Sequence, residues 1–201
     1  MPPLSPEEAA SVARACLEAT VEALAPVAQD ARWTLFLDGA EEPWITALAA
    51  AHGMRIAHQS AGDLGARLRA AFRELRAAGA PRVIALGADS PTLPPERLEE
   101  GIEAIAASDL VLGPTEDGGY YLVGSRVTDE AIFRDIPWST ERVLEITLDR
   151  AAQAGLSVRM LPAWYDIDDL EGLRRLGGER TRGGEAAGRL RAVLDSLRGK
   201  L

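Results

Sequence analysis

Residues 83–91 read VIALGADSP, an apolar run that ends on a carboxylate. Four successive apolar residues are typical of a strand that is buried on both faces, as the strands of parallel sheets are. Gly87 and Pro91 bound the end of this run. Asp89 therefore stands where a buried strand leaves the sheet, and there it either opens a turn or holds a ligand.

Strand-like and helix-like segments alternate along the rest of the chain. Periodicity and capping signals predict helices near residues 5–24, 43–51, 63–78, 94–107 and 140–154. Apolar runs between them predict further strands near residues 33–37, 54–58, 110–112, 120–123 and 156–161. This alternation predicts an α/β fold, a three-layer sandwich with a mostly parallel sheet.

Two segments divide the expected domain organisation. We expect one main domain over residues 1–176, followed by a glycine-rich loop and a C-terminal helix over residues 177–201. The loop is predicted to be flexible between Gly177 and Gly188. The apolar spacing of Leu190, Leu194 and Leu197 predicts an amphipathic helix that either packs back onto the domain or meets a partner.

Composition excludes several classes of function. The 201 residues include 31 acidic and 22 basic side chains, and the net charge of −9 disfavours binding to nucleic acid. Cys16 is the only cysteine, so an internal disulfide is excluded, and its helical spacing predicts a packed thiol. The sole lysine, Lys200, stands next to the C-terminus, which excludes a Walker-type phosphate loop and Schiff-base chemistry. Without a signal-like or membrane-spanning segment, we expect a cytoplasmic protein with no membrane partner.

A second acidic cluster follows the last predicted strand, in the sequence WYDIDD over residues 164–169. Alternation along an extended segment points Asp166 and Asp168 the same way. Together with Asp89 they can converge on one hard divalent cation, since Mg²⁺ takes one or two carboxylates and completes its shell with phosphate and water. The alternative is that Asp168 or Asp169 caps a helix that begins near Leu170.

A third acidic corner lies in LGPTEDGGYY, residues 112–121. The two glycines indicate a sharp bend into a strand, with backbone close to a ligand, although a plain hairpin explains them equally well. A hairpin does not explain why Glu116 and Asp117 crowd the same corner.

Four segments, GADSP, LGPTEDGGYYLVG, IPWST and WYDIDDLEGL, occur in this order and together resemble one family. From Ser5 to about Leu176 the chain resembles the small GT-A-like transferases called radical-SAM/selenodomain-associated transferase 1. Relatives of that family include molybdenum-cofactor guanylyltransferase and phospholactate guanylyltransferase. The resemblance implies a nucleotide-diphospho-sugar transferase fold.

The resemblance also implies roles for individual residues. Asp89 matches the acid that holds Mg²⁺ or Mn²⁺ on the nucleotide diphosphate, and Asp168, with Asp166 beside it, matches the later metal ligand. Gly118, Gly119 and Tyr120 match the hairpin that lines the acceptor pocket. The remaining residues implied to contact nucleotide or substrate are Gln59, Gly62, Asp63, Leu64, Gly65, Arg67, Trp138, Ser139 and Thr140. For Asp63 a helix cap, and for residues 138–140 a cap above a packed aromatic ring, explain the pattern as well.

One part of the family pattern is missing. The family begins with a strand and a basic loop of the form FAKAPxPGxVKTRL, whereas this sequence runs from MPPL straight into its first helix. The missing strand would lie centrally, beside the strand that bears Asp89, so its loss would leave unpaired backbone. Three explanations compete: a shortened sequence, a sheet that closes without the strand, or a second chain that fills the gap.

The sequence therefore predicts a metal-dependent transferase acting on a nucleotide or nucleotide-sugar donor and a small-molecule acceptor. Asp89 with Glu116 or Asp117 is expected to be catalytic, with either acid of the pair orienting or deprotonating the acceptor hydroxyl. The family description favours sugar transfer. Nucleotidyl transfer with release of pyrophosphate is the first alternative, and a catalytically degenerate binding protein is the second. A homodimer is compatible with the sequence.

Overall fold

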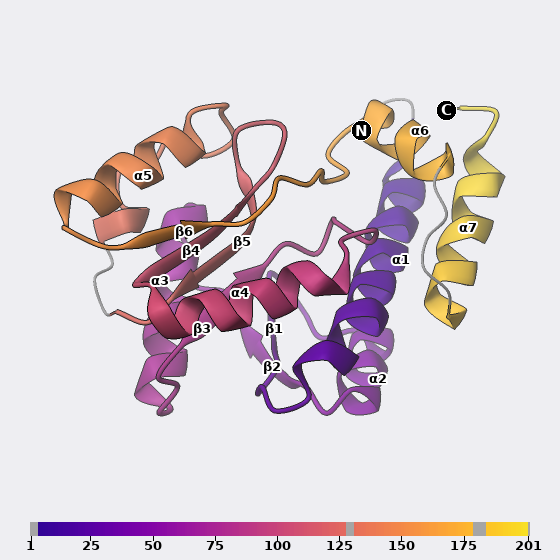
Figure 1. Ribbon diagram of the computed structural model, residues 1–201. Coiled ribbons are helices and arrows are strands. Elements are labelled where there is room, and N and C mark those ends of the chain that lie inside the picture. The colour runs from indigo at the N-terminus through magenta and orange to yellow at the C-terminus, as the bar shows by residue number, and fades with distance from the viewer. Residues whose placement is uncertain (1–3, 128–130, 179–183, 201) are drawn as a thin grey trace.

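The computed structural model describes residues 4–127, 131–178 and 184–200 (Figure 1). Helices and strands alternate as the sequence predicts. The helices are α1 (Pro6–Leu24), α2 (Pro43–Ala51), α3 (Leu64–Ala77), α4 (Pro95–Ala107), α5 (Val143–Gln153), α6 (Leu170–Gly178) and α7 (Glu185–Leu197). The strands are β1 (Thr34–Leu37), β2 (Arg55–His58), β3 (Val83–Leu86), β4 (Leu110–Pro114), β5 (Tyr120–Ser125) and β6 (Val158–Met160). Two short 3-10 helices that the sequence did not indicate, η1 (Ala25–Ala28) and η2 (Ala131–Phe133), complete the elements.

Local signals fix several helix starts. Ser5 and Glu8 form a capping box at the start of α1, in which the Ser5 backbone N–H donates to Glu8 Oε2 over 2.7 Å. The side chain of Asp63 accepts a hydrogen bond from the Ala66 backbone N–H and caps α3. These two starts lie within one residue of their predicted positions because the caps are encoded in adjacent residues.

The strands form two separate sheets among the described residues. A two-stranded parallel sheet joins β1 to β2, and a four-stranded sheet has the order β3-β5-β4-β6. In the larger sheet β4 and β6 are parallel, whereas β5 runs antiparallel to both of its neighbours. The prediction of an α/β fold with parallel strands is confirmed, and β5 is the element that departs from it.

Helices cover both faces of the four-stranded sheet. On β4, Val111 packs against the layer that contains α4, while Leu110 and Leu112 pack toward α3, η2 and α5. All three side chains are fully buried. Figure 1 shows α4 along one face of this sheet, and the two hydrophobic clusters make the three layers that the sequence predicts.

The split between the two sheets falls where the sequence predicts a missing strand. Strand β1 pairs with β2 alone, and β3 pairs with β5 alone, so each has one unpaired edge among the described residues. The side chains of Ile84, Ala85 and Leu86 in β3 are only partly buried, although their sequence is typical of a central strand. The described part of the sheet thus does not close across this position.

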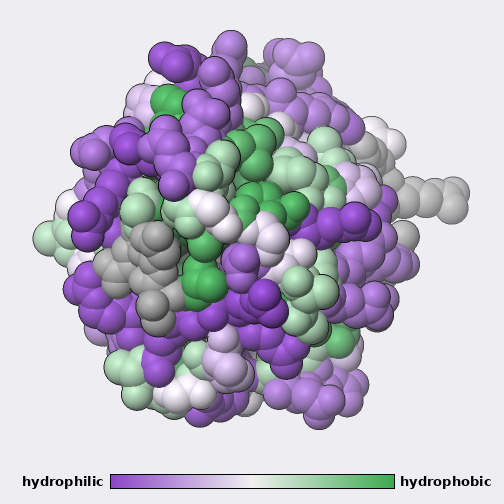
Figure 2. All heavy atoms as spheres, turned by 60° about the vertical axis from the view of Figure 1, so that its left-hand side comes forward, coloured by the Kyte–Doolittle hydropathy of each residue, from purple (hydrophilic) through white to green (hydrophobic). Residues whose placement is uncertain are grey.

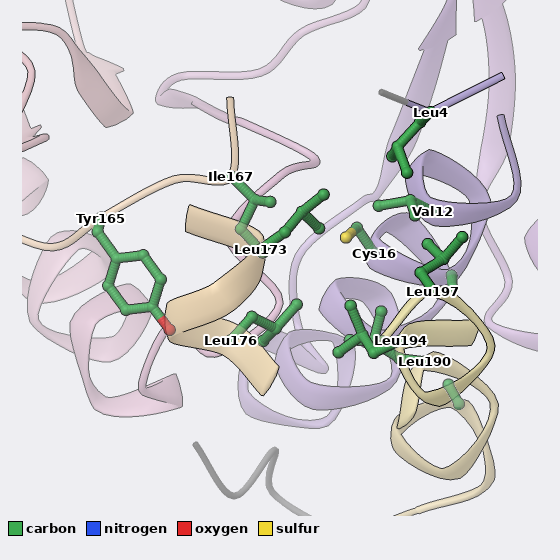
Figure 3. Packing of buried hydrophobic residues seen from close by; sticks show 13 residues of the cluster. Leu4, Val12, Cys16, Tyr165, Ile167, Leu173, Leu176, Leu190, Leu194 and Leu197 are labelled. Carbon is green, nitrogen blue, oxygen red and sulfur yellow. The ribbon is translucent and has the colours of Figure 1, made fainter. Parts of the chain in front are cut away.

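A third cluster joins the two ends of the chain. Helix α7 packs along α1, and Leu190, Leu194 and Leu197 are at most 3% exposed (Figure 3). The expectation that the C-terminal helix packs back onto the domain is confirmed. Of the predicted loop between Gly177 and Gly188, residues 179–183 lie outside the described part; α6 reaches Gly178 and α7 begins at Glu185, so its described ends are helical.

Hydrophilic residues dominate the face in Figure 2, with hydrophobic residues gathered near its middle. No helix in the described ranges is long and apolar enough to cross a membrane.

Candidate metal and nucleotide site

The predicted acidic residues gather beyond the carboxyl ends of β3, β4 and β6. The pairing of β4 with β6 continues past the strands, because the Trp164 backbone N–H donates to Pro114 O over 3.0 Å and the Glu116 N–H donates to Trp164 O over 3.1 Å. This extension places residues 115–117 alongside residues 164–166, and a bridge pairs Thr115 with Trp164. The carboxyl edge of such a sheet is where α/β proteins bind ligands.

Three carboxylates meet at this edge. Asp117, Asp166 and Asp168 each offer an oxygen, and the three oxygens all lie within 4.8 Å of one another. We call these residues the acid triad. Asp166 is partly buried and the other two are exposed. The triad has the donor set that hard divalent cations prefer, so its geometry and chemistry fit a metal ion.

Asp89 is close to the triad but is not a member of the group of oxygens within 4.8 Å. Its backbone carbonyl accepts a hydrogen bond from the Ile167 N–H over 3.0 Å, which ties the end of β3 to the segment that bears Asp166 and Asp168. Its carboxylate lies over Gly87, where an added Cβ would meet Oδ1 at 2.6 Å. Glycine at position 87 therefore allows the acid to fold back toward the sheet.

The raised pKa values of these acids reflect burial and the repulsion between their negative charges. Burial, and after it the charges of Asp168, Asp117 and Asp89, raise the pKa of Asp166 to about 6. Burial, followed by the charges of Asp168 and Asp117, also raises the pKa of Asp89. The pKa of Asp168 is raised by burial and then by Asp117 and Asp169. Positive charge brought to this edge would relieve the repulsion.

The two neighbouring acids at the start of α6 divide their roles. Asp169 caps α6, since its Oδ1 accepts a hydrogen bond from the Gly172 N–H over 2.8 Å. Asp168 belongs to the triad instead. The helix cap is therefore found at Asp169, and the role of Asp168 as a metal ligand stays a prediction.

The hairpin between β4 and β5 orients Asp117. Its Oδ1 accepts hydrogen bonds from the Thr115 hydroxyl and, over 3.0 Å, from the Gly119 N–H. Gly118 has a φ of 90°, and a Cβ there would meet Glu141 O at 2.2 Å. Glycine at position 118 is required because the turn packs directly against the segment before α5.

Tyr120 and Trp138 pack together beside this hairpin. Their rings make an edge contact with centroids 6.3 Å apart, and burial raises the pKa of the Tyr120 hydroxyl. Trp138 also lies against Gly65, where a Cβ would meet its Nε1 at 2.7 Å. The alternative of an aromatic ring packed beneath a turn thus accounts for the described contacts of both residues.

Residues 138–140 precede a helix rather than open it. Helix α5 begins at Val143, three residues after Thr140. Ser139 has a φ of 62°, and the Thr140 hydroxyl donates to Pro137 O over 2.7 Å. The predicted helix start was wrong because this local turn and its left-handed residue compete with helical backbone.

A polar network joins the ends of β1 and β2 to the start of α3. Arg67 Nη1 donates to Asp38 Oδ2 over 2.7 Å and to Gln59 Oε1 over 2.9 Å, and its Nε donates to Gly62 O. The Gln59 amide donates in turn to Phe36 O. Gly62 has a φ of 114°, Asp63 caps α3, Gly65 is buried, and Leu64 is 49% exposed. The predicted nucleotide segment forms one network at the carboxyl ends of β1 and β2, in the smaller sheet, and Asp38 belongs to it.

Glu116 is held by an arginine that the sequence analysis did not single out. Arg175 Nη1 pairs with Glu116 Oε2 over 2.7 Å, and its guanidinium lies 3.7 Å from the centroid of the Tyr165 ring. The loop after β3 also contributes: the Ser90 and Thr92 hydroxyls donate to the Tyr165 carbonyl and hydroxyl oxygens. No short motif marks these contacts, because their partners are 59 to 75 positions away.

The α/β layers, with parallel strands that end at an acidic edge, are similar in fold to the GT-A-like nucleotide-diphospho-sugar transferases. A protein from Desulfovibrio desulfuricans G20, described as a nucleotide-diphospho-sugar transferase, superposes with a TM-score of 0.82 at 25% identity, over 96% of this chain and 84% of that chain. A CMP:2-keto-3-deoxy-manno-octonic acid synthetase complexed with CTP shares the fold, with a TM-score of 0.50 at 14% identity over 92% of this chain and 88% of that chain. The particular family is DUF2064, described as "Uncharacterized protein conserved in bacteria", to which the chain belongs through residues 20–140.

A curated relative adds a reaction to this class. The chain is 30% identical over 138 residues to phosphoenolpyruvate guanylyltransferase from Chloroflexus aggregans (strain MD-66 / DSM 9485). The match covers 67% of this chain and 66% of the relative, so the chain spans just under two thirds of that relative's length. The resemblance to nucleotide-diphospho-sugar transferases is confirmed, and the narrower radical-SAM-associated family stays a prediction.

Proposed function

We propose that this protein is a divalent-metal-dependent nucleotidyltransferase that joins the nucleoside monophosphate part of a nucleoside triphosphate to a small-molecule acceptor. The observation that carries the proposal is the acid triad, in which oxygens of Asp117, Asp166 and Asp168 lie within 4.8 Å at the carboxyl edge of the sheet. Mg²⁺ or Mn²⁺ would be held by these three residues, with Asp89 adding negative charge from beneath.

In the proposed reaction an acceptor oxygen attacks the α-phosphorus of the triphosphate. A bond forms between that oxygen and phosphorus, the bond between the α-phosphorus and its bridging oxygen to the β-phosphate breaks, and pyrophosphate leaves. A bound divalent ion supplies Lewis-acid stabilisation of the charge on the phosphates. Where the acceptor oxygen is a hydroxyl, Asp89, whose pKa is raised by burial, is the carboxylate that we assign to receive its proton; an ionised phosphate or carboxylate oxygen would attack with no proton to transfer.

Relatives favour nucleotidyl transfer over the sugar transfer that the sequence analysis favoured. The curated relative is named as a guanylyltransferase, and one solved structure of the same fold is a CMP-sugar-acid synthetase that holds CTP. Sugar transfer would instead break the bond between the anomeric carbon and the diphosphate. Sugar transfer is the second candidate, because the similar Desulfovibrio protein is described as a nucleotide-diphospho-sugar transferase.

The nucleotide would lie between the triad and the start of α3. The N-terminus of a helix offers backbone N–H groups to phosphate. In α3 the Ala66 N–H already donates to the Asp63 side chain, so it is not among the N–H groups offered to phosphate. Arg67 is held at this helix start by hydrogen bonds to Asp38 and Gln59. The hairpin at Gly118 and Gly119, with Tyr120 behind it, and the turn at Trp138, Ser139 and Thr140 would bound the acceptor side.

Product analysis tests the proposal. The protein is incubated with Mn²⁺, each of the four common nucleoside triphosphates and a panel of acceptors that begins with phosphoenolpyruvate; parallel reactions contain sugar nucleotides. We expect pyrophosphate to be released from one triphosphate only when its acceptor is present, and the Asp168→Asn variant to release none. Release of nucleoside diphosphate from a sugar nucleotide would support sugar transfer instead.

The degenerate binding protein makes a different prediction. It would release neither product, and no nucleotide would raise the melting temperature even with Mn²⁺ present. If Mn²⁺ and one nucleotide raise the melting temperature but no product forms, the proposed metal site is supported and the proposed reaction is contradicted.

A further inference from the structure

Helix α6 connects the two segments that carry the acid triad. At its start, Asp169 caps the helix and is the immediate neighbour of Asp168. In its last turn, Arg175 pairs with Glu116, the immediate neighbour of Asp117. One short helix therefore contacts the β4–β5 hairpin at one end and continues the 166–168 segment at the other.

Arg175 makes contacts of two different kinds near the triad. Its guanidinium pairs with Glu116 over 2.7 Å, and it also lies over the Tyr165 ring, 3.7 Å from the centroid. Tyr165 is the immediate neighbour of Asp166. Arg175 thus contacts one neighbour of a triad residue on each side of the triad.

The Tyr165 ring under Arg175 is buried and restrained by several contacts. The residue is 4% exposed, its ring stacks on Trp164 with centroids 5.7 Å apart, and Figure 3 shows it extending toward α6. Its carbonyl accepts from Ser90 Oγ over 3.2 Å and its hydroxyl accepts from Thr92 Oγ1 over 2.9 Å. Glu116, by contrast, is 59% exposed, so its carboxylate is restrained mainly by Arg175.

We infer that Arg175 is a positioning residue: together with the backbone pairing of Glu116 with Trp164, it helps to fix the separation of Asp117 from Asp166 and Asp168 by linking the Glu116 carboxylate to the buried Tyr165 ring. The inference rests on the proposed function, because that separation matters only if the triad binds a divalent cation. It assigns Arg175 no contact with the ion or the substrate. Residues that orient metal ligands from outside typically change metal affinity by about 10- to 100-fold when they are removed.

The sign of the effect separates positioning from simple charge. Arg175 is a cation near a site for a cation, so Coulomb repulsion alone predicts that Arg175→Gln tightens Mn²⁺ binding. Positioning predicts the opposite, because without Arg175 the hairpin bearing Asp117 keeps its backbone pairing with Trp164 but loses the side-chain contact that adds to it, so Asp117 is held less closely to the other two acids. The two accounts cannot both hold for the same measurement.

The experiment is a titration of the full chain with Mn²⁺ alone, followed by calorimetry or by the electron paramagnetic resonance signal of free Mn²⁺. We expect Arg175→Gln to bind Mn²⁺ about 10-fold more weakly than the wild type. Arg175→Lys keeps the charge but loses the planar group over Tyr165, so it should recover only part of the affinity. Arg14→Gln is the matched control, since Arg14 also pairs with a glutamate, Glu18, and lies over an aromatic ring, Trp44, neither of which is a sequence neighbour of a triad residue.

A double variant completes the test. If charge alone matters, Glu116→Gln weakens binding, Arg175→Gln strengthens it, and the two together restore the wild-type affinity. If Arg175 acts through Glu116, the double variant binds as weakly as either single variant. Thermal unfolding of each variant shows that it is folded, and Arg175→Lys carries the test if Arg175→Gln is not.

The outcomes distinguish this inference from the proposed function. Wild-type protein that binds no Mn²⁺ overturns both. Wild-type protein that binds Mn²⁺ while Arg175→Gln binds it equally or more tightly overturns the positioning role and leaves the metal site intact. Weaker binding in Arg175→Gln and in the double variant, with Arg14→Gln unchanged, supports the role.

Discussion

Two acidic regions of this molecule are built in opposite ways. Glu18 on α1 is 7% exposed, yet its two oxygens pair with Arg14 over 2.9 Å and with Arg189 of α7 over 2.8 Å. The acid triad gathers three carboxylates, and among the residues that the structure describes no arginine or lysine forms an ion pair with any of them. Within the described ranges, the fold thus neutralises Glu18 with two arginines and pairs no cationic side chain with the acid triad.

The pKa values follow this difference. Burial raises the pKa of Glu18, but hydrogen bonds from Arg14 and Arg189 outweigh it and hold the pKa below its usual value. At Asp166 burial and neighbouring carboxylates act together and raise the pKa to about 6. An acid that is paired with arginines, such as Glu18, links two helices. Carboxylates at a sheet edge that lack such partners repel one another, so a bound cation would lower the free energy of the folded protein.

The largest expected effect is on metal binding. Asp168→Asn removes one of the three charged oxygen donors, and we expect Mn²⁺ affinity to fall by more than about 100-fold, a larger loss than removal of an outer residue causes. Calorimetric titration measures it. Asp195→Asn, on the exposed surface of α7, is the control and should bind as the wild type does. Equal affinity in Asp168→Asn and the wild type would contradict the triad as a metal site.

The next largest effect is on the free energy of unfolding when Glu18, the acid paired with two arginines, is replaced. Glu18→Gln leaves two arginines beside a neutral side chain, and since both arginines are half exposed we expect a loss of about 2 kcal/mol, below the range for fully buried pairs. Denaturant unfolding at pH 7 measures it. Because the folded pKa is lowered, the contribution of Glu18 is present above its unfolded pKa and is lost as the pH falls through the folded value. A loss that does not diminish in acid would contradict this assignment.

The triad should show the opposite behaviour. The folded pKa of Asp166 is about 6, above its ordinary value of 3.8, so over this range the folded protein keeps the proton that the unfolded chain loses. Stability therefore falls as the pH rises from about 4 to about 6. Above pH 6 the penalty is constant. In metal-free protein Asp166→Asn should therefore gain about 1 kcal/mol at pH 7, after allowance for solvent screening. Urea unfolding at pH 4 and pH 7 checks this, and an Asp166→Asn variant less stable than the wild type at pH 7 would refute it.

The smallest expected effect is the loss of stability when one of the two arginines that pair with Glu18 is removed. Arg189→Gln leaves the Arg14 pair intact, and we expect a loss of about 0.5 kcal/mol, typical of a half-exposed ion pair. Denaturant unfolding in low and high salt measures it. The loss should shrink in high salt, because the remaining pair and the lost pair are both screened.

Much of the fold follows from local sequence signals. The capping box at Ser5 and Glu8, the apolar run at residues 83–86 and the alternation of segments predicted the elements to within a few residues. Predictions missed where tertiary contacts override local preference. The left-handed Ser139 delays α5 to Val143, α6 was indicated only by its cap before Leu170, and η1 and η2 were not indicated.

The candidate site was predicted in its acids but not in its assembly. Asp117, Asp166 and Asp168 were each singled out from the sequence, yet Asp117 was expected to act on the acceptor rather than to join the other two. Asp89 was expected among the metal ligands, and this role stays a prediction; its carboxylate lies over Gly87, outside the acid triad. Arg175, Ser90 and Thr92 carried no motif.

The sequence by itself determined the α/β class, the positions of the strand ends and the acids that follow them, since side-chain periodicity and helix caps are properties of neighbouring residues. Only the tertiary structure decided which acids meet, because the separation of Asp117 from Asp166 depends on pairing between β4 and the segment after β6, some fifty residues apart. It also decided which acids receive an arginine: Glu18 gains Arg189 from the far end of the chain, and the triad gains none from the described residues. Charge compensation is a sum over neighbours in space, and neighbours in space are set by packing.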